Sequence, residues 1–168
     1  AKSNDTNESS RIYSTSNGGE SWDIVGSGPA TNIIKGVVYV SSDVGFFCYD
    51  YVEGMDSNLY KTDDGGKTFA KVMLEEQELD SSAANPQGQE TETKTDSGKN
   101  GADSSEQLRW GDVYKEALTP VVDSTGIVTI YLTQGKNAVY NDGKTAAKYQ
   151  SSDKGSSWKY IGQVEIKD

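Results

Sequence analysis

The stretch STSNGGESW at residues 14–22 places small polar residues and two glycines directly before a tryptophan. The same arrangement returns as KTDDGGKTF at residues 61–69 and as QSSDKGSSW at residues 150–158. A pattern that occurs three times in 168 residues indicates a repeated structural unit. The eight residues that end on the aromatic residue are called box 1 (15–22), box 2 (62–69) and box 3 (151–158).

Each box carries the residue types that close a tight turn. An Asp or Asn at its third position accepts hydrogen bonds from backbone N–H groups one to three residues further along the chain. A glycine two residues later supplies the positive φ that such a turn demands. The final aromatic ring folds back between strands, where its burial contributes about 2 to 3 kcal/mol. The boxes are therefore predicted to brace hairpins, with Asp64 and Asp153 structural rather than catalytic or metal-binding.

The spacing of the boxes predicts antiparallel strands. Counted between the aromatic residues, the first gap is 69 − 22 = 47 residues and the second is 158 − 69 = 89. A four-stranded antiparallel unit takes about 40 residues at about 5 to 6 per strand. The first gap therefore fits one unit, and the second is about twice as long. Runs such as NIIKGVVYVSS (32–42) and VGFFCYDYV (44–52) have the β-branched and aromatic residues of strands.

The chain is therefore predicted to be all-β, with antiparallel four-stranded units. No stretch of roughly eleven residues or more carries the 3.6-residue apolar period of a helix. The predicted organisation is a single domain that spans residues 1–168. It comprises a hairpin (10–26), a first complete unit (32–74), an insertion (75–107) and a second complete unit (112–166).

The insertion at residues 75–107 differs in composition from the rest of the chain. Two lysines and nine acidic residues give it a net charge of 2 − 9 = −7, most of the −10 of the whole chain. Low hydropathy together with high net charge is typical of a segment that cannot offset the entropy lost on ordering. We interpret it as a mobile, solvent-exposed loop, with a charged lid over a ligand as the alternative.

The composition excludes several classes of function. With 16 basic and 26 acidic residues, the chain lacks the positive footprint that nucleic acids and anionic membrane surfaces require. No apolar run approaches the roughly 20 residues of a membrane span. The absence of histidine excludes Ser-His-Asp and Cys-His catalysis and His-based zinc sites within this chain. No metal or cofactor is predicted, and the only cysteine, Cys48, is interpreted as a buried structural thiol.

The box residues resemble the Asp-box, or BNR repeat, whose pattern is Ser/Thr-x-Asp-x-Gly-x-Thr/Ser-Trp/Phe. Box 1 departs from the pattern, because Asn17 stands at the Asp position. The matching residues are Thr15, Asn17, Gly19, Ser21 and Trp22; Thr62, Asp64, Gly66, Thr68 and Phe69; and Ser151, Asp153, Gly155, Ser157 and Trp158. Asp-boxes are best known from sialidases and related β-propellers, where each box lies at the periphery between the third and fourth strands of a blade. The resemblance therefore implies a sialidase-like, partial β-propeller.

Propellers close with about four to eight blades, whereas the two complete units and one hairpin supply fewer. Three completions are left open: a fragment of a longer chain, a homo-oligomeric ring, or a compact β-sandwich or barrel. Boxes also occur in microbial ribonucleases and in reelin-type β-sandwiches, so they do not fix the fold alone.

The catalytic residues of sialidases are not matched. The resemblance would require three arginines on the substrate carboxylate, a Tyr nucleophile with a Glu partner, and an Asp acid/base. This chain has only two arginines, Arg11 and Arg109, and Arg11 is predicted to be a surface or strand-end residue. No catalytic residue is assigned. Asp50, Glu53 and Asp56 are the strongest candidates for a glycoside hydrolase pair, and a solvated turn is the alternative for them.

The leading hypothesis is a non-enzymatic, exported protein, extracellular or in the cell envelope, that binds a glycan or a protein partner. The polar start of the chain, AKSNDTNESS, is interpreted as a mature or trimmed N-terminus, with a cloned fragment as the alternative. Ten tyrosines and three tryptophans suit stacking on sugars. The candidate binding residues are Trp110, expected to be exposed, with Arg109, Tyr49, Tyr51 and Asp50. The alternatives are a module of a sialidase-like glycoside hydrolase with an incomplete active site, and an assembly factor that docks through the acidic insertion.

Overall fold

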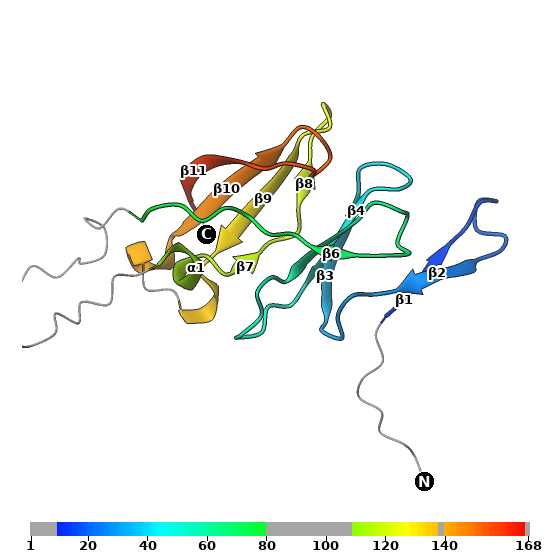
Figure 1. Cartoon of the computed structure of the whole chain (residues 1–168), viewed down its shortest axis with the longest axis horizontal. Coiled ribbons are helices and arrows are strands. Elements are labelled where there is room, and N and C mark those ends of the chain that lie inside the picture. The colour runs from blue at the N-terminus through cyan, green and yellow to red at the C-terminus, as the bar shows by residue number, and fades with distance from the viewer. Residues whose placement is uncertain (1–9, 80–108, 138–139, 167–168) are drawn as a thin grey trace, which may run out of the picture.

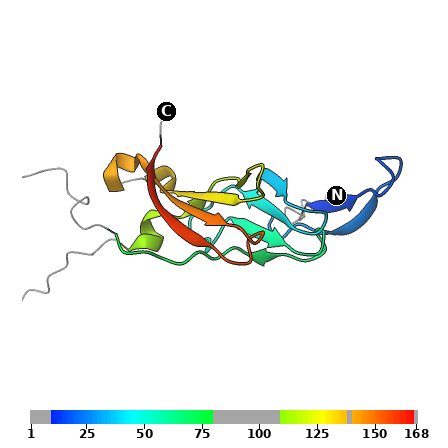
Figure 2. The ribbon, with the colours of Figure 1, turned by 90° about the horizontal axis from the view of Figure 1, so that it is seen from above.

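The computed structural model describes residues 10–79, 109–137 and 140–166. It consists of three antiparallel β-sheets that follow one another along the long axis of the molecule (Figures 1 and 2). The prediction of an all-β chain with antiparallel four-stranded units is confirmed. In the described part of the chain the sheets form a row and do not close into a barrel.

The first sheet is a hairpin of β1 (Arg11–Ser14) and β2 (Asp23–Ser27), and box 1 joins its two strands. Arg11 is exposed at the start of β1, as predicted for a strand-end residue. The second sheet contains β3 (Ile34–Tyr39), β4 (Gly45–Tyr49), β5 (Leu59–Thr62) and β6 (Ala70–Lys71) in chain order. Box 2 joins its third and fourth strands.

The third sheet has the same order, but its first strand is interrupted. β7 (Glu116–Ala117) and β8 (Val121–Val122) both pair with β9 (Val128–Thr133), on either side of Pro120. Proline has no backbone N–H to donate to a neighbouring strand, which accounts for the break. β10 (Thr145–Ser151) and β11 (Lys159–Glu165) complete the sheet, and box 3 joins them.

Three short helical turns lie beside the third sheet: α1 (Trp110–Val113), η2 (Gly135–Asn137) and η3 (Tyr140–Gly143). None of them was predicted, because three or four residues are too few to show a helical period. In the described residues, no helix is long and apolar enough to cross a membrane.

The middle sheet is covered on both faces, because alternate residues of β4 point to opposite sides. Phe47 and Tyr49 face the hairpin and pack with Ile12 of β1. Phe46 and Cys48 face the third sheet and pack in a cluster that includes Val128 and Ile130 of β9. Burial raises the pKa of the Cys48 thiol to about 11, as expected for the structural thiol that the sequence predicted. The core therefore consists of two layers of side chains between three sheets.

A buried asparagine links the second and third sheets through polar contacts. Asn58 is 1% exposed at the start of β5. Its side-chain Nδ2 donates to the carbonyl oxygens of Tyr49 at 2.8 Å and Ala117 at 2.9 Å. Its Oδ1 accepts from the Ala117 backbone N–H at 2.8 Å. One side chain thus binds three buried backbone groups, and the two carbonyl oxygens have the weak Cys48 thiol as a second donor, at 3.9 and 3.3 Å.

One expectation from the sequence is wrong, and another concerns residues that the structure does not describe. Trp22 of box 1 was predicted to anchor in a core, and this is wrong, because 59% of it is exposed. The insertion predicted at residues 75–107 falls mostly outside the described residues, which end at 79 and resume at 109. Its mobility and the single-domain boundaries therefore stay predictions.

Candidate functional site

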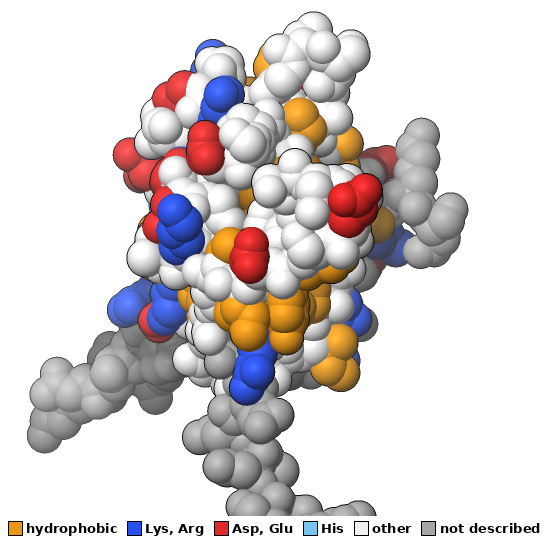
Figure 3. All heavy atoms as spheres, turned by 90° about the vertical axis from the view of Figure 1, so that its right-hand side faces the viewer, with side chains coloured by type: hydrophobic (Ala, Val, Ile, Leu, Met, Phe, Trp, Pro, Cys, Tyr) orange, Lys and Arg blue, Asp and Glu red, His pale blue; other side chains and the backbone are white. Residues whose placement is uncertain are grey.

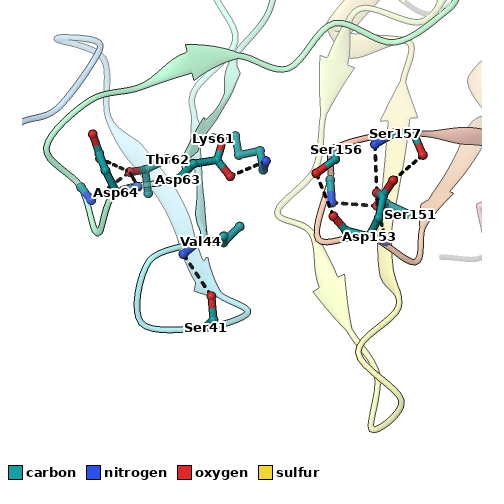
Figure 4. A network of polar contacts seen from close by, with 12 residues as sticks. Ser41, Val44, Lys61, Thr62, Asp63, Asp64, Ser151, Asp153, Ser156 and Ser157 are labelled. Carbon is teal, nitrogen blue, oxygen red and sulfur yellow. Dashed lines mark hydrogen bonds and ion pairs between the residues drawn. The ribbon is translucent and has the colours of Figure 1, made fainter.

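The three boxes form the turns that their residue types predict. In box 2, the Asp64 carboxylate accepts hydrogen bonds from the Thr68 backbone N–H at 2.8 Å and its hydroxyl at 2.6 Å. The Gly66 N–H donates to the Thr62 hydroxyl oxygen at 2.8 Å. Box 3 repeats these contacts with Asp153 and Ser157, and Figure 4 shows both turns side by side. The box carboxylates thus form the hydrogen bonds that hold the turns.

Box 1 makes the same turn with one reversed hydrogen bond. The Asn17 Oδ1 accepts from the Ser21 backbone N–H at 3.0 Å, as an aspartate would. Its Nδ2 instead donates to the Ser21 hydroxyl oxygen at 2.9 Å, whereas the hydroxyl is the donor in boxes 2 and 3. Asparagine therefore keeps both contacts with the residue at the seventh position of the box, without a charge.

Because of these contacts, the free energy of unfolding should fall as the pH is lowered into the acid range. Hydrogen bonds, first from the Thr68 hydroxyl, lower the pKa of Asp64 from 3.8 to about 2. Those from Ser157 hold the pKa of Asp153 well below its usual range. A depressed folded-state pKa contributes stability that is present above the unfolded value and lost as pH falls through the folded value. The contribution of Asp64 should therefore be lost between about pH 4 and about pH 2, and the loss from Asp153 continues below this range.

The test is the urea midpoint of unfolding between pH 5 and pH 2. The double variant Asp64→Asn with Asp153→Asn should lose less stability over this range than the parent protein, because its boxes no longer titrate. Asn17→Asp is the converse variant and should steepen the loss, because it adds a titrating box. Identical pH profiles for all three proteins would contradict a role of the box carboxylates in acid stability.

A cleft of about 500 Å³ opens at the ends of the sheets opposite the boxes. β5 starts beside it and runs toward box 2, so the cleft and the box turns lie at different ends of the same strand. The connection between β4 and β5 lines one side, and α1 with the residues leading to β7 lines another. Residues 72–74 and Glu76, which follow β6, contribute the rest of its wall. The cleft therefore lies between the second and third sheets.

The cleft brings together three of the five predicted binding residues, Tyr51, Arg109 and Trp110. Tyr51 is half-buried and Arg109 is exposed. The expectation of an exposed Trp110 is wrong, because its side chain is only 4% exposed. It packs with Tyr114 at a centroid distance of 4.6 Å and with Tyr160 at 5.3 Å. Trp110 thus supports the wall of the cleft and offers no open stacking face.

Tyr49 and Asp50 lie away from the cleft, which corrects their selection as binding residues. Tyr49 is fully buried and faces the hairpin, with its ring 5.7 Å from that of Tyr60. The alternation of β4 explains this, because Tyr49 lies on the face opposite Cys48. Asp50 forms an ion pair with Lys35 at 2.7 Å. Neither side chain lines the cleft.

Two of the three candidate carboxylates line the cleft, and a lysine neutralises each. Glu53 contacts the Lys115 ammonium at 3.1 Å, and Asp56 contacts that of Lys71 at 2.7 Å. The hydrogen bond with Lys71 lowers the pKa of Asp56. A glycosidase acid needs a carboxyl group with a raised pKa. Asp56 therefore does not suit the role of a glycosidase acid. As a charged carboxylate it can accept hydrogen bonds from a ligand.

Several residues of the cleft belong to no sequence pattern that would predict a binding site. Tyr114 and Lys115 follow α1, and Glu76 falls inside the stretch assigned to the acidic insertion. They meet the loop at residues 51–58 only because the second and third sheets pack together. Within the described residues, no group of acidic or cysteine side chains is arranged to hold a metal ion.

Comparison with protein-family models gives no match, and none of the curated proteins matches the chain. A solved structure, the GH74 enzyme of Niastella koreensis, superimposes with a TM-score of 0.45 at 16% sequence identity. The alignment covers 93% of this chain and 20% of that enzyme. The chain thus spans about a fifth of the length of the structure that it matches.

Proposed function

We propose that this protein is a binding module that holds a neutral oligosaccharide in the cleft between its second and third sheets. The observation that carries the proposal is the composition of that cleft. Its volume of about 500 Å³ lies within the range of small-molecule sites, about 300 to 1,000 Å³. The half-buried ring of Tyr51 and several hydrogen-bonding side chains line it together, which is the combination that a sugar ring with its hydroxyl groups requires.

The charge of the cleft selects among sugars. Four carboxylates line it against two basic side chains, and Lys71 outside the lining pairs with Asp56, so the local excess is one negative charge (4 − 3). The acidic residues are Glu53, Asp56, Glu76 and Asp112. An anionic sugar would be repelled there, whereas the hydroxyl groups of a neutral sugar can donate to these carboxylates. Together with the missing third arginine, this favours a neutral oligosaccharide over a sialylated one.

Binding rather than hydrolysis fits the state of the carboxyl groups. Each candidate acid of the loop at residues 50–56 has a lysine partner within 3.1 Å. Hydrolysis by the usual mechanism needs one carboxyl group that stays protonated near neutral pH. The hydrogen bond with Lys71 acts in the opposite direction for Asp56, because it lowers the pKa of this carboxyl group. These residues can hold a sugar without cleaving it.

The proposal is tested by calorimetric titration with neutral oligosaccharides that a glycan array selects. Tyr51→Ala and Glu53→Gln should each weaken binding about tenfold, which corresponds to about 1.4 kcal/mol. Glu20→Gln, in the exposed turn of box 1, makes the same carboxylate-to-amide change outside the cleft and should leave the affinity unchanged.

Three results would contradict the proposal. Equal losses of affinity in Glu20→Gln and Glu53→Gln would place the binding site elsewhere. Release of fluorophore from a panel of aryl glycosides would show that the protein is a hydrolase rather than a binding module. Preference for a sialylated oligosaccharide would contradict the choice of a neutral ligand.

A further inference from the structure

The third position of box 1 is an asparagine followed directly by a glycine, whereas boxes 2 and 3 have aspartates at this position. The pair is Asn17 and Gly18. In an Asn-Gly pair the backbone nitrogen of the glycine can attack the side-chain amide carbon, because glycine has no Cβ to hinder the approach. Every other asparagine of the described residues is followed by a residue that has a side chain. Asn17 is therefore the described asparagine whose amide is easiest to attack from the backbone.

The amide of Asn17 is also open to the water that its hydrolysis requires. Box 1 is exposed at the hairpin end of the molecule, which faces the viewer in Figure 3. The equivalent Asp153 is exposed as well, although the Trp158 ring of box 3 packs on Phe46 of the second sheet. Solvent access at the third position is thus a property of the turn and does not depend on what lies beside the hairpin.

The hydrogen bonds of the turn are placed where charge changes during loss of the amide. The Thr15 hydroxyl donates to the Asn17 Oδ1 at 2.9 Å, and the Ser21 backbone N–H donates to the same oxygen at 3.0 Å. Donors held against an oxygen that becomes negative lower the barrier for addition to its carbonyl group. The Ser21 hydroxyl lies 2.9 Å from the Nδ2 that has to leave, and it can give this nitrogen a proton.

An aspartate fits this turn better than the asparagine does. In boxes 2 and 3 the hydroxyl of the residue at the seventh position donates to the carboxylate at 2.6 Å. In box 1 the direction is reversed, and the amide nitrogen donates to the Ser21 hydroxyl at 2.9 Å. Hydrogen bonds to a charged group are shorter and stronger than those between neutral groups. With an aspartate at position 17, the Ser21 hydroxyl would donate as Thr68 and Ser157 do.

We propose that the turn of box 1 promotes the deamidation of Asn17, and that the resulting aspartate completes the box. The Gly18 nitrogen gives its proton to the solvent and bonds to the Asn17 Cγ. The bond from Cγ to Nδ2 then breaks, and the nitrogen takes up a proton and leaves as ammonia. Water adds to the Cγ of the cyclic imide, and the bond from Cγ to the Gly18 nitrogen breaks. This step restores the backbone N–H and leaves a carboxyl group that ionises, so that water is the only co-reactant.

The proposal is tested by incubation of the folded protein at mildly alkaline pH, followed by peptide mapping with mass spectrometry. The peptide that contains Asn17 should show the mass change of deamidation before those that contain Asn32 and Asn58. Gly18→Lys should slow the conversion about tenfold, which corresponds to about 1.4 kcal/mol in the barrier. This variant keeps the turn, because Lys154 holds the same place in box 3 with a φ of +58°, against +71° for Gly18.

Two variants of Ser21 test whether the turn takes part. Ser21→Ala removes the hydroxyl beside the leaving nitrogen and should also slow the conversion about tenfold. Ser21→Thr introduces the residue that box 2 has at its seventh position, Thr68, and should restore the parent rate. Conversion of Ser21→Ala at the parent rate would overturn the proposal that the turn promotes the reaction.

The product has a readout of its own in the acid unfolding profile. After incubation, the parent protein should lose stability from about pH 5 to about pH 2 as steeply as Asn17→Asp, because a third box then titrates. Gly18→Lys incubated alongside should keep its original profile. A peptide around Asn17 that stays unchanged as long as that of Asn32 would overturn the proposal. A product that is mainly isoaspartate would do so as well, because its longer main chain cannot form the hydrogen bonds of the box.

Discussion

Replacement of Asn58 with alanine should lower the free energy of unfolding by about 4 kcal/mol, the largest effect expected in this protein. The variant leaves the carbonyl groups of Tyr49 and Ala117 and the N–H of Ala117 without their partner. Each buried polar group that loses its hydrogen bond costs about 1 to 3 kcal/mol. Urea unfolding followed by far-UV circular dichroism measures the difference.

The matched control for this variant is Asn32→Ala. Asn32 is also an asparagine that donates to a backbone carbonyl, that of Asp50 at 3.1 Å, but it is half-buried and does not join two sheets. Its replacement should cost about 1 kcal/mol. Asn58→Asp should be at least as harmful as Asn58→Ala, because it turns an oxygen toward two carbonyl groups. Equal stabilities of the Asn58→Ala and Asn32→Ala proteins would show that the link between the sheets is not important.

Gly155→Ala should cost about 3 kcal/mol, the second largest effect. Gly155 has a φ of +81°, where a side chain costs about 1 to 2 kcal/mol. A Cβ there would also lie 2.6 Å from Phe46 and 3.1 Å from Trp158, so box 3 would be pushed off the second sheet. Overpacking of this kind adds about 1 to 3 kcal/mol. The unfolding midpoint in urea provides the measurement.

Gly19→Ala separates the two contributions, because Gly19 holds the same place in box 1. Its φ is +97°, and a Cβ there would approach nothing closer than the Trp22 ring at 3.8 Å. This variant should show only the cost of positive φ, about 1 kcal/mol. A loss in Gly19→Ala as large as in Gly155→Ala would mean that backbone conformation, and not packing between sheets, limits the box.

The elements that the sequence could predict are those with a local cause. The boxes were predicted in residue detail because their hydrogen bonds join residues at most four positions apart, as between Asp64 and Thr68. The strands on either side follow from β-branched and aromatic runs such as GFFCY in β4. The strand that follows box 2 is short, since β6 covers only Ala70–Lys71.

The cleft could not be predicted in the same way, because it depends on how the second and third sheets pack. Tyr51 and Trp110 are 59 positions apart by number (110 − 51), and no local pattern brings them to one wall. Trp22 shows that a complete local pattern does not decide whether a side chain is buried. Its box is complete, but its burial depends on a neighbouring surface that the turn itself does not contain.

The three tryptophans also give the molecule three separate optical reporters. Indole emission shifts to shorter wavelength as its surroundings become less polar, and each ring has different surroundings. Trp22 lies largely in solvent, Trp158 packs on Phe46 at the junction of two sheets, and Trp110 is buried beside the cleft. Proteins that retain one tryptophan each would therefore report on the first hairpin, on separation of the sheets and on ligand entry as distinct spectral changes.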